Sequence, residues 1–339
     1  MSWRLAQALD HVIALEPALG AAASVRPGPA TDPFRDPPAA ERGDFARLYR
    51  AARRRVGRPL AAQAALALHT RLGRGDRVLL TTGLVAAGIP RGETDGPSGT
   101  LALARALILS RRVRATILAE DAVVPALAAA AAVLAASEED GAFWLPGLTL
   151  QGISARVEDA ERESRALWRD LRPVAIVSIE KLGPNGRGVI HNMRGQDVTA
   201  TQARTDLLFA MANAARRLTV GVGDRGNEIG MGGLGTGARC QCPCGGRIAC
   251  AVPAAVPVVA FSSNWGAQAM TAALAAVTRM PRLLPRPQSE VRMLRRLARA
   301  GVVDGVTRRR APSVDGGGLA LQAAILTLLH SLIETPARS

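Results

Sequence analysis

The sequence is poor in aromatic residues and almost devoid of lysine. Phe, Trp and Tyr make up 3% of its 339 residues, so the core must be built mainly from Ala, Val, Leu and Ile. The formal net charge is +15, and because Lys181 is the only lysine, this excess comes from arginine. The arginines are dispersed, and few aromatic side chains are present on which bases would stack. Nucleic acid is therefore not the expected partner.

Long hydrophobic runs are also missing. The nearest candidate, residues 122–136, is rich in alanine and shorter than the ~18 to 20 apolar residues that a membrane-spanning helix needs. The N-terminus does not combine a basic start with an apolar block and a cleavage site, and it carries Asp10 and Glu16 early. We expect no membrane partner and a cytoplasmic location.

Cysteine is scarce, and its pattern excludes a secreted disulfide framework. Cys240, Cys242 and Cys244 lie together, with Cys250 nearby. This tight spacing differs from the paired knuckles of structural zinc sites, so plain thiols are favoured over zinc ligands. The role of the cluster stays open.

Apolar runs and helical periods alternate along the chain. We expect an N-terminal helix and a Pro- and Gly-rich arm over residues 1–43, followed by one α/β domain over residues 44–335. Strands are predicted at 77–82, 114–118, 173–178, 217–222 and 257–261, with a short one near Leu148. Helices are predicted at 4–22, 43–72, 98–110, 122–136, 158–171, 203–217, 263–277, 288–301 and 317–334. The alternation predicts a mainly parallel, twisted sheet flanked by helices on both faces.

Polar residues follow the ends of these strands. They are Glu93 and Asp95, Glu120 and Asp121, Glu180, Asp224 and Glu228, and Asn264. Each of them alone is explained as well by a turn or a helix cap. Because ligands of parallel sheets bind beyond the carboxyl ends of the strands, their shared position predicts one acidic active site at that edge.

The densest of these segments is Gly221-Val-Gly-Asp-Arg-Gly-Asn-Glu-Ile-Gly-Met-Gly232. Five glycines break any helix or strand, and two carboxylates and an amide stand among them. An acidic surface loop is the plain alternative to a ligand site. The segment formally matches a dinucleotide fingerprint, but Asp224 and Glu228 would sit where a pyrophosphate needs bare N–H groups. We expect no nucleotide cofactor.

Other catalytic classes find less support. The sequence has no phosphate-binding loop with Gly-Lys-Ser/Thr, and His191 is the only histidine near the acidic segments, so a serine–histidine hydrolase is poorly supported. A metal-dependent phosphohydrolase remains an alternative, because it would use the same acids together with the helix N-terminus at Ser98. A non-enzymatic protein that binds polyanions through its arginines also stays open.

A set of motifs in one order carries a family resemblance. They are Gly92-Glu-Thr-Asp-Gly-Pro97, Asn192-Met-Arg-Gly195 with Asp197, Gly223-Asp-Arg-Gly-Asn-Glu-Ile-Gly-Met-Gly232, Ile248-Ala-Cys250, Ser263-Asn-Trp-Gly266, and Val303-Asp-Gly-Val-Thr307 with Ser313-Val-Asp-Gly316. Over residues 44–335 the chain closely resembles the D-glutamate cyclase family. The resemblance implies a lyase that converts D-glutamate to 5-oxo-D-proline with loss of water.

The chain departs from the family pattern in three places. Arg225 stands where the family usually has a glycine, Lys181 stands where an arginine is common, and the segment around Cys242 is normally free of cysteine. The arginine could narrow the pocket, and the other two departures leave their own roles open.

The expected chemistry fits these residues. Lactam closure needs a neutral amine to attack a carboxyl carbon, whose charge a metal ion or a proton must neutralise. Clustered acids can bind Mn²⁺ or Mg²⁺ through oxygen, or take the ammonium proton. We therefore expect Glu93, Asp95, Asp224 and Glu228 to act as catalytic residues and metal ligands. Thr94, Asn192, Asn227 and Asn264 are expected to bind the substrate, and Arg194 to clamp its carboxylate. The sequence does not decide which acid is the base, or whether the chain forms a homo-oligomer.

Overall fold

The sheet of the computed structural model is entirely parallel. Residues 1–16, 43–135, 145–235 and 246–334 are described, and within them six strands pair in the order β3-β2-β1-β4-β5-β6. The strands are β1 (Arg77–Thr81), β2 (Arg114–Glu120), β3 (Leu148–Ile153), β4 (Ala175–Ile179), β5 (Leu218–Gly223) and β6 (Val256–Val259). The predicted parallel α/β fold is confirmed, including the short strand near Leu148.

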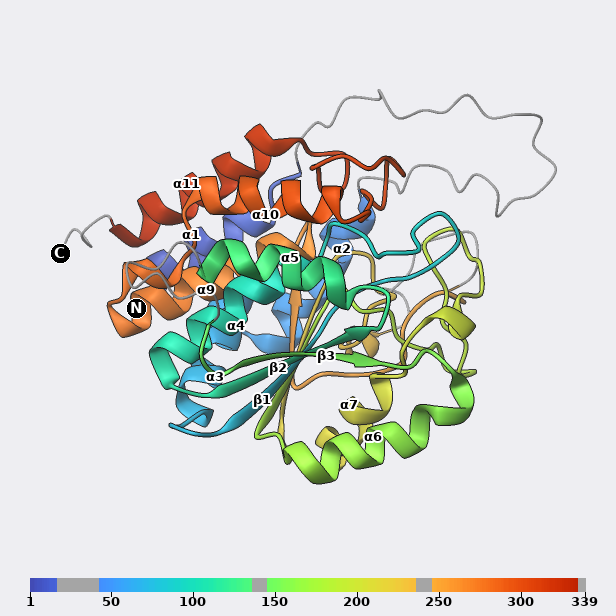
Figure 1. The fold of residues 1–339 in the computed structure, drawn as a ribbon. Helices are drawn as coiled ribbons and strands as arrows, with labels where there is room; N and C mark the ends of the chain where they lie inside the picture. Colours follow the sequence, from blue (N-terminus) through green and yellow to red (C-terminus); the bar gives the residue numbers. More distant parts are fainter. Residues whose placement is uncertain (17–42, 136–144, 236–245, 335–339) are drawn as a thin grey trace.

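Alternate residues of the strands face two different helical layers (Figure 1). Val78 and Leu80 of β1 belong to the larger core cluster, whereas Leu79 belongs to the smaller one. The larger cluster lies under α3 (Leu60–Arg71), α4 (Pro97–Arg111) and α9 (Ser263–Thr278), which are alanine-rich and therefore pack closely. The smaller cluster lies against α6 (Val157–Leu171) and α7 (Asp206–Ala214).

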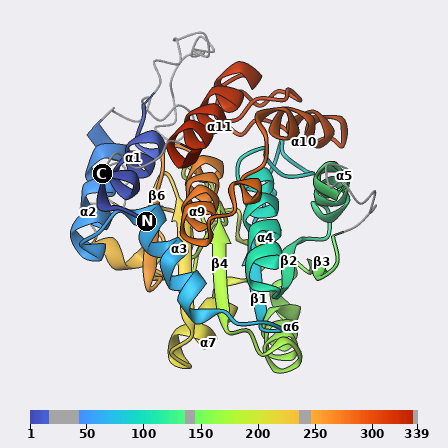
Figure 2. The same cartoon turned by 90° about the vertical axis from the view of Figure 1, so that its left-hand side faces the viewer.

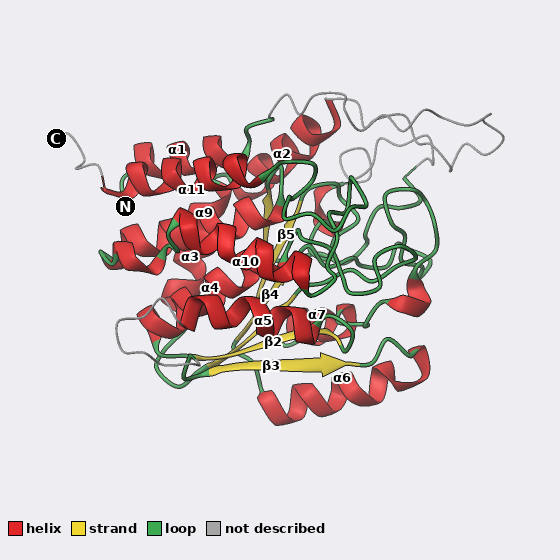
Figure 3. Ribbon diagram, turned by 45° about the horizontal axis from the view of Figure 1, so that its top comes forward, coloured by secondary structure: helices red, strands yellow, loops and turns green. Residues whose placement is uncertain are grey.

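Further helices cover the larger layer from outside (Figure 2). They are α1 (Trp3–Ile13), α2 (Gly43–Val56), α5 (Val124–Ala135), α10 (Pro287–Arg299) and α11 (Leu319–Glu334). None of the helices in the described ranges has both the length and the hydropathy needed to cross a membrane. The loops gather beyond the ends of the strands, on the side to which the arrow of β3 points (Figure 3).

The single helix predicted over residues 43–72 is wrong, because the chain forms α2 and α3 with a break at 57–59. Gly57 has a φ of 70°, and Pro59 precedes the first residue of α3. The first N–H groups of α3 are satisfied by a distant residue: the buried carboxylate of Asp10 accepts from Leu60 N at 2.6 Å and Ala61 N at 3.0 Å. Asp10 therefore caps α3 from α1.

Three sequence features lie outside the described residues: most of the Pro- and Gly-rich arm, the cysteines at 240, 242 and 244, and the end of the chain after Glu334. Cys250 is described, and its buried sulfur accepts a hydrogen bond from Val252 N at 3.3 Å. The arm and the cysteine cluster stay as predictions from the sequence.

Candidate active site

The candidate site lies where the order of the strands reverses. The chain fills the sheet outward from β1 to β3 and then returns to the other side of β1 with β4. In such sheets the loops after the two central strands diverge and leave a crevice for a ligand. The predicted residues come from the loops after β1, β4 and β5 and from the start of the helix after β6, all at this edge of the sheet.

Carboxylates from four separate segments meet there. One oxygen each of Asp95, Asp224 and Asp315 lie within 4.8 Å of one another, and so do one oxygen each of Glu180, Asp224 and Glu228. The two trios share Asp224, so the predicted convergence of Asp95 and Asp224 is observed. We call these five residues together with Glu93 the acid cluster. Glu93 interacts electrostatically with Asp95 and Glu228.

The protein itself offers little positive charge to the acid cluster. Burial, followed by repulsion from Asp95, raises the pKa of Glu93 to about 8. Burial raises the pKa of Glu180, Asp224 and Asp315 well above their usual range, and neighbouring carboxylates add to each increase. The ion pair from Arg225 Nε to Asp224 Oδ2, at 3.1 Å, opposes the increase at Asp224. The acid cluster therefore favours protons or a bound cation.

A divalent metal ion fits the donors that are present. Carboxylate oxygens are the ligands that Mn²⁺ and Mg²⁺ take in proteins, and both trios bring three of them within reach of one ion. Asp315 Oδ2 is buried and has no hydrogen-bond partner among the described residues. A buried carboxylate oxygen without a hydrogen-bond partner is unusual, and a bound cation would provide the missing interaction.

Asp95 is fixed by the start of α9. Its Oδ1 accepts from Asn264 N at 2.8 Å and from the Ser262 hydroxyl at 2.9 Å, while its Oδ2 accepts from Ser263 N at 2.9 Å. The side chain therefore caps the N-terminus of α9 from the loop after β1, which holds this carboxylate rigidly beside Asp224.

The predicted substrate-binding role of Asn264 is not what its contacts indicate. Its Oδ1 accepts from Gly96 N at 3.0 Å and Gly99 N at 2.9 Å, and its Nδ2 donates to Thr94 O at 2.9 Å. Because these bonds tie α9 to the loop after β1, we assign Asn264 a positioning role.

Two other predicted substrate-binding residues keep free polar atoms. Asn227 donates from Nδ2 to His191 O at 3.0 Å, but its Oδ1 is buried without a partner among the described residues. The hydroxyl of Thr94 is likewise buried and unpartnered in that part of the chain. Both atoms are available to a ligand.

The side chain of Asn192 fixes the shape of its own loop through hydrogen bonds to the backbone. Asn192 Oδ1 accepts from Arg194 N at 2.9 Å and Gln196 N at 3.1 Å, which closes a turn rather than presenting the amide to a ligand. The side chain of Arg194 is exposed. Its charge reaches Arg308, whose pKa it helps to lower after the larger effect of burial.

The glycine-rich loop binds its own backbone instead of a phosphate. Glu228 Oε1 accepts from Arg225 N at 3.0 Å, and Oε2 accepts from Gly226 N at 2.8 Å. A side chain at Gly223 would lie 2.6 Å from Glu228 Oε2, so the glycine makes room for this carboxylate. Glu228 thus occupies the N–H groups that a pyrophosphate would need.

The N-terminus of α4 is also taken by protein groups, which weighs against a phosphohydrolase. Ser98 donates its hydroxyl to Glu290 Oε1 at 2.6 Å, and the N–H groups of Gly96 and Gly99 are bonded to Asn264. Burial raises the pKa of Glu290 to about 7. A phosphate would have to displace these bonds beside a buried carboxyl group.

Glu120 does not join the acid cluster, although it also follows a strand. Its Oε1 pairs with the ammonium group of Lys181, which is fully buried, and accepts from Ala203 N at 2.8 Å. Lys181 Nζ also donates to Gly83 O at 3.1 Å. This pair is balanced within the protein, and Asp121 beside it is exposed.

The sequence analysis placed Glu180 among the acids at the strand ends but gave it no role, and it missed Asp315 although Asp315 stood in a motif that it had singled out. Both have a positive φ, 49° for Glu180 and 50° for Asp315. Four of the seven non-glycine residues with positive φ are arginines just after helices, where a left-handed residue is common. The other three are Glu180, Asp315 and Arg308, and such strain at a crevice is typical of functional sites.

The sequence is also similar to those of known proteins. A family profile described as "D-glutamate cyclase-like, C-terminal" matches residues 48–330. The chain is 31% identical over 237 residues to the human protein named "D-glutamate cyclase, mitochondrial". That match covers 65% of this chain and 36% of the human protein, so the chain spans about a third of its relative.

Proposed function

The chain belongs to the D-glutamate cyclase-like family, and we propose that it is a lyase that converts D-glutamate to 5-oxo-D-proline with loss of water. The observation that carries the proposal is the pair of buried carboxylate trios that share Asp224 at the reversal of strand order. The human relative's name supports the choice of substrate, although the match covers 36% of that protein.

The reaction sets a clear requirement for proton transfer. At neutral pH the substrate carries an ammonium group and a γ-carboxylate. Lactam formation makes one C–N bond, breaks one C–O bond and moves two protons from the nitrogen to the departing oxygen, which leaves as water. The site must therefore accept protons at one point and return them at another.

The acid cluster is suited to that transfer. In the trio of Glu180, Asp224 and Glu228, burial and then repulsion between carboxylates raise the pKa of Glu180 and Asp224, so these two accept protons from the ammonium group. Glu93 holds a proton at neutral pH, since its pKa is raised to about 8, and donates it to the departing oxygen. Of the two protons taken from the nitrogen, the trio returns one to the departing oxygen, and the other restores the proton of Glu93. Thr94 and the Oδ1 of Asn227 orient the substrate through their free polar atoms.

Asp95, Asp224 and Asp315 would hold a divalent cation, Mn²⁺ or Mg²⁺. Such an ion, when bound, would neutralise negative charge in the crevice. Arg194 extends positive charge at the exposed side of the Asn192 loop, where it would attract an anionic substrate. The sequence favours a cytoplasmic location, while the name of the human relative places that protein in mitochondria.

The purified chain, incubated with D-glutamate, L-glutamate and a generic phosphoester, tests this proposal. Each substrate is supplied with Mn²⁺, with Mg²⁺ or with a chelator, and products are separated by chiral chromatography. We expect lactam from D-glutamate only, with less of it after metal removal. Phosphate release without lactam would contradict the proposal and favour the phosphohydrolase.

A further inference from the structure

The loop from Val303 to Gly316 is built around one buried carboxylate. Asp304 is fully buried; its Oδ1 accepts from Val306 N at 3.0 Å and Thr307 N at 2.8 Å. Its Oδ2 accepts from the Ser313 hydroxyl at 2.6 Å and Gly316 N at 2.9 Å. Four bonds from one side chain give this loop a fixed shape.

The same loop is docked on the loop after β1. Thr94 N donates to Val303 O at 2.9 Å, and Val303 N donates to Gly92 O at 3.2 Å. A side chain at Gly305 would lie 2.1 Å from Glu93 Oε2, so the carboxyl group of Glu93 rests directly on this glycine. The loop therefore delivers Asp315 to the acid cluster and covers Glu93.

Arg308 stands at the turn of this fixed loop. Its φ is 58°, and its N–H donates to Asp304 O at 2.8 Å. This left-handed backbone conformation is unfavourable for any residue that has a Cβ atom. Positive φ at a non-glycine residue persists where surrounding bonds impose it. The direction of the Arg308 side chain is thus set by the scaffold around Asp304.

The guanidinium group of Arg308 has buried donors with no partner. Nε and Nη1 are both buried, and neither is hydrogen-bonded to a described residue. Its charge is attracted by Glu93 and repelled by Arg194. A buried charged donor without a partner is costly, so native proteins keep one chiefly where a ligand completes it.

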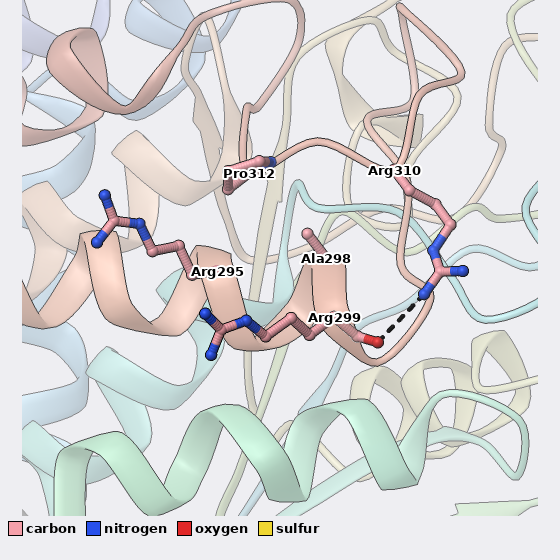
Figure 4. A pocket seen from close by; sticks show the side chains of 5 residues that line it. All are labelled: Arg295, Ala298, Arg299, Arg310 and Pro312. Atoms are coloured by element: carbon pink, nitrogen blue, oxygen red, sulfur yellow. Dashed lines mark hydrogen bonds between the residues drawn. The ribbon is translucent and has the colours of Figure 1, made fainter.

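The other arginines near this loop are either paired with a carboxylate or lie at the surface. Arg225 is paired with Asp224 and lies over the ring of Phe261, 5.9 Å from its centroid. Arg310 turns to the outer surface, where it lines a depression with Arg295 and Arg299 and donates to Arg299 O at 3.2 Å (Figure 4). Arg194 is exposed. Arg308 is partly buried, has two buried donor atoms without a partner among the described residues, and interacts electrostatically with Glu93.

We propose that Arg308 binds a carboxylate of the ligand, namely the α-carboxylate of the amino-acid substrate. The identity of the ligand rests on the proposed function. Of the two substrate carboxylates, the γ group is consumed, whereas the α group keeps its charge from substrate to lactam. A permanently charged guanidinium suits the group that stays charged, and it draws the α-carboxylate away from the repelling acids. This assigns to Arg308 the clamp that the sequence suggested for Arg194.

Product binding isolates the carboxylate from the chemistry. 5-Oxo-D-proline carries the carboxylate, and 2-pyrrolidinone is the same lactam ring without it. Both are titrated by calorimetry into the wild-type protein, Arg308→Met, Arg308→Lys, Arg194→Met and the control Arg309→Met, whose side chain is exposed. Melting curves verify that each variant is folded.

We expect Arg308→Met to weaken 5-oxo-D-proline binding about 10- to 100-fold, the usual loss for a charge-assisted hydrogen bond, and to leave 2-pyrrolidinone unaffected. Arg308→Lys should lose less, because it keeps the charge but not the planar donors. The KM for D-glutamate should rise in parallel. Arg309→Met should match the wild-type protein.

The outcomes separate this inference from the proposed function. Lactam formation by the wild-type protein with unchanged product binding in Arg308→Met would overturn the inference and leave the reaction standing. A larger loss in Arg194→Met than in Arg308→Met would return the clamp to Arg194. If D-glutamate is not cyclised but Arg308→Met still loses carboxylate binding, the reaction fails and the clamp remains. No carboxylate binding by the wild-type protein would overturn the clamp.

Discussion

Two groups of buried charge lie beyond the same edge of the sheet, and they differ in how their charge is balanced. Glu120 and Lys181 form a pair with one positive and one negative group, closed further by Gly83 O and Ala203 N. The acid cluster gathers six carboxyl groups, of which Asp224 is paired with Arg225. Strand ends alone therefore do not identify a site. An excess of one charge that the protein leaves unbalanced is the more informative sign.

The largest effect is expected from breaking the balanced pair. Lys181→Met would leave the Glu120 carboxylate buried without its cation, which costs about 3–5 kcal/mol of unfolding free energy. Urea denaturation measures this loss. The double variant Glu120→Gln with Lys181→Met should recover most of it, because neither charge remains. Equal stability of the single variant and the wild-type protein would show that the pair is not balanced as described.

The acid cluster should respond differently, because loss of one of its carboxylates should affect turnover more than stability. Asp224→Asn removes the carboxylate that both trios share, so kcat for D-glutamate should fall at least ~10²-fold. Its stability should fall less than that of Lys181→Met, because relief of repulsion among like charges offsets the loss of the ion pair with Arg225. Steady-state kinetics and urea denaturation on the same preparation test both halves. Normal turnover in a folded Asp224→Asn protein would place the chemistry in another loop.

The pH dependence of stability gives a third contrast. The pKa of Glu93 is raised from 4.5 to about 8, so between these values the native state holds a proton that the unfolded chain has lost. Metal-free protein should therefore lose stability as pH rises across this window, at up to about 1.4 kcal/mol per pH unit for each such carboxyl. Urea denaturation at several pH values measures the slope. Glu93→Gln should make this slope less steep, because one such carboxyl is removed. A free energy of unfolding of the wild-type protein that does not change with pH would contradict the proposed excess of negative charge in the acid cluster.

The smallest effect is expected from the cysteines at 240, 242 and 244, which lie outside the described residues. Their segment is not among the strand ends that form the acid cluster, so replacing all three with serine should leave kcat and KM near the wild-type values. Kinetics of the triple variant test this. A folded but inactive triple variant would mean that the cysteines belong to the site.

The sequence predicted the fold more completely than the contacts within the site. Apolar runs such as 77–82 specify buried strands locally, because period and composition act over a few residues. The break between α2 and α3 is signalled locally by Gly57 and Pro59, which the helical pattern on either side obscured. The cap of α3 has no local signal, because it comes from Asp10, 50 residues earlier in the chain. Local patterns do not report such distant partners.

The same limit applies to the candidate site. The motifs placed Asp95, Asp224 and Glu228 in one crevice, and the structure brings them together. The sequence does not show which hydrogen bonds each polar atom of the site makes. Asp95 Oδ2, for example, accepts a hydrogen bond from Ser263 N at the start of α9, which lies 168 residues further along the chain. Arg308 was missed for the same reason, since its orphaned donors become visible only when the loop around Asp304 is folded.

The most direct measurement compares lactam formation from D-glutamate by the wild-type protein, Asp224→Asn, and the double variant Glu120→Gln with Lys181→Met. All three are assayed at one enzyme concentration with saturating Mn²⁺, and 5-oxo-D-proline is quantified by chiral chromatography. We predict that the double variant retains turnover close to the wild-type value while Asp224→Asn loses at least ~10²-fold. Loss of turnover in the double variant together with normal turnover in Asp224→Asn would contradict the assignment of the chemistry to the acid cluster.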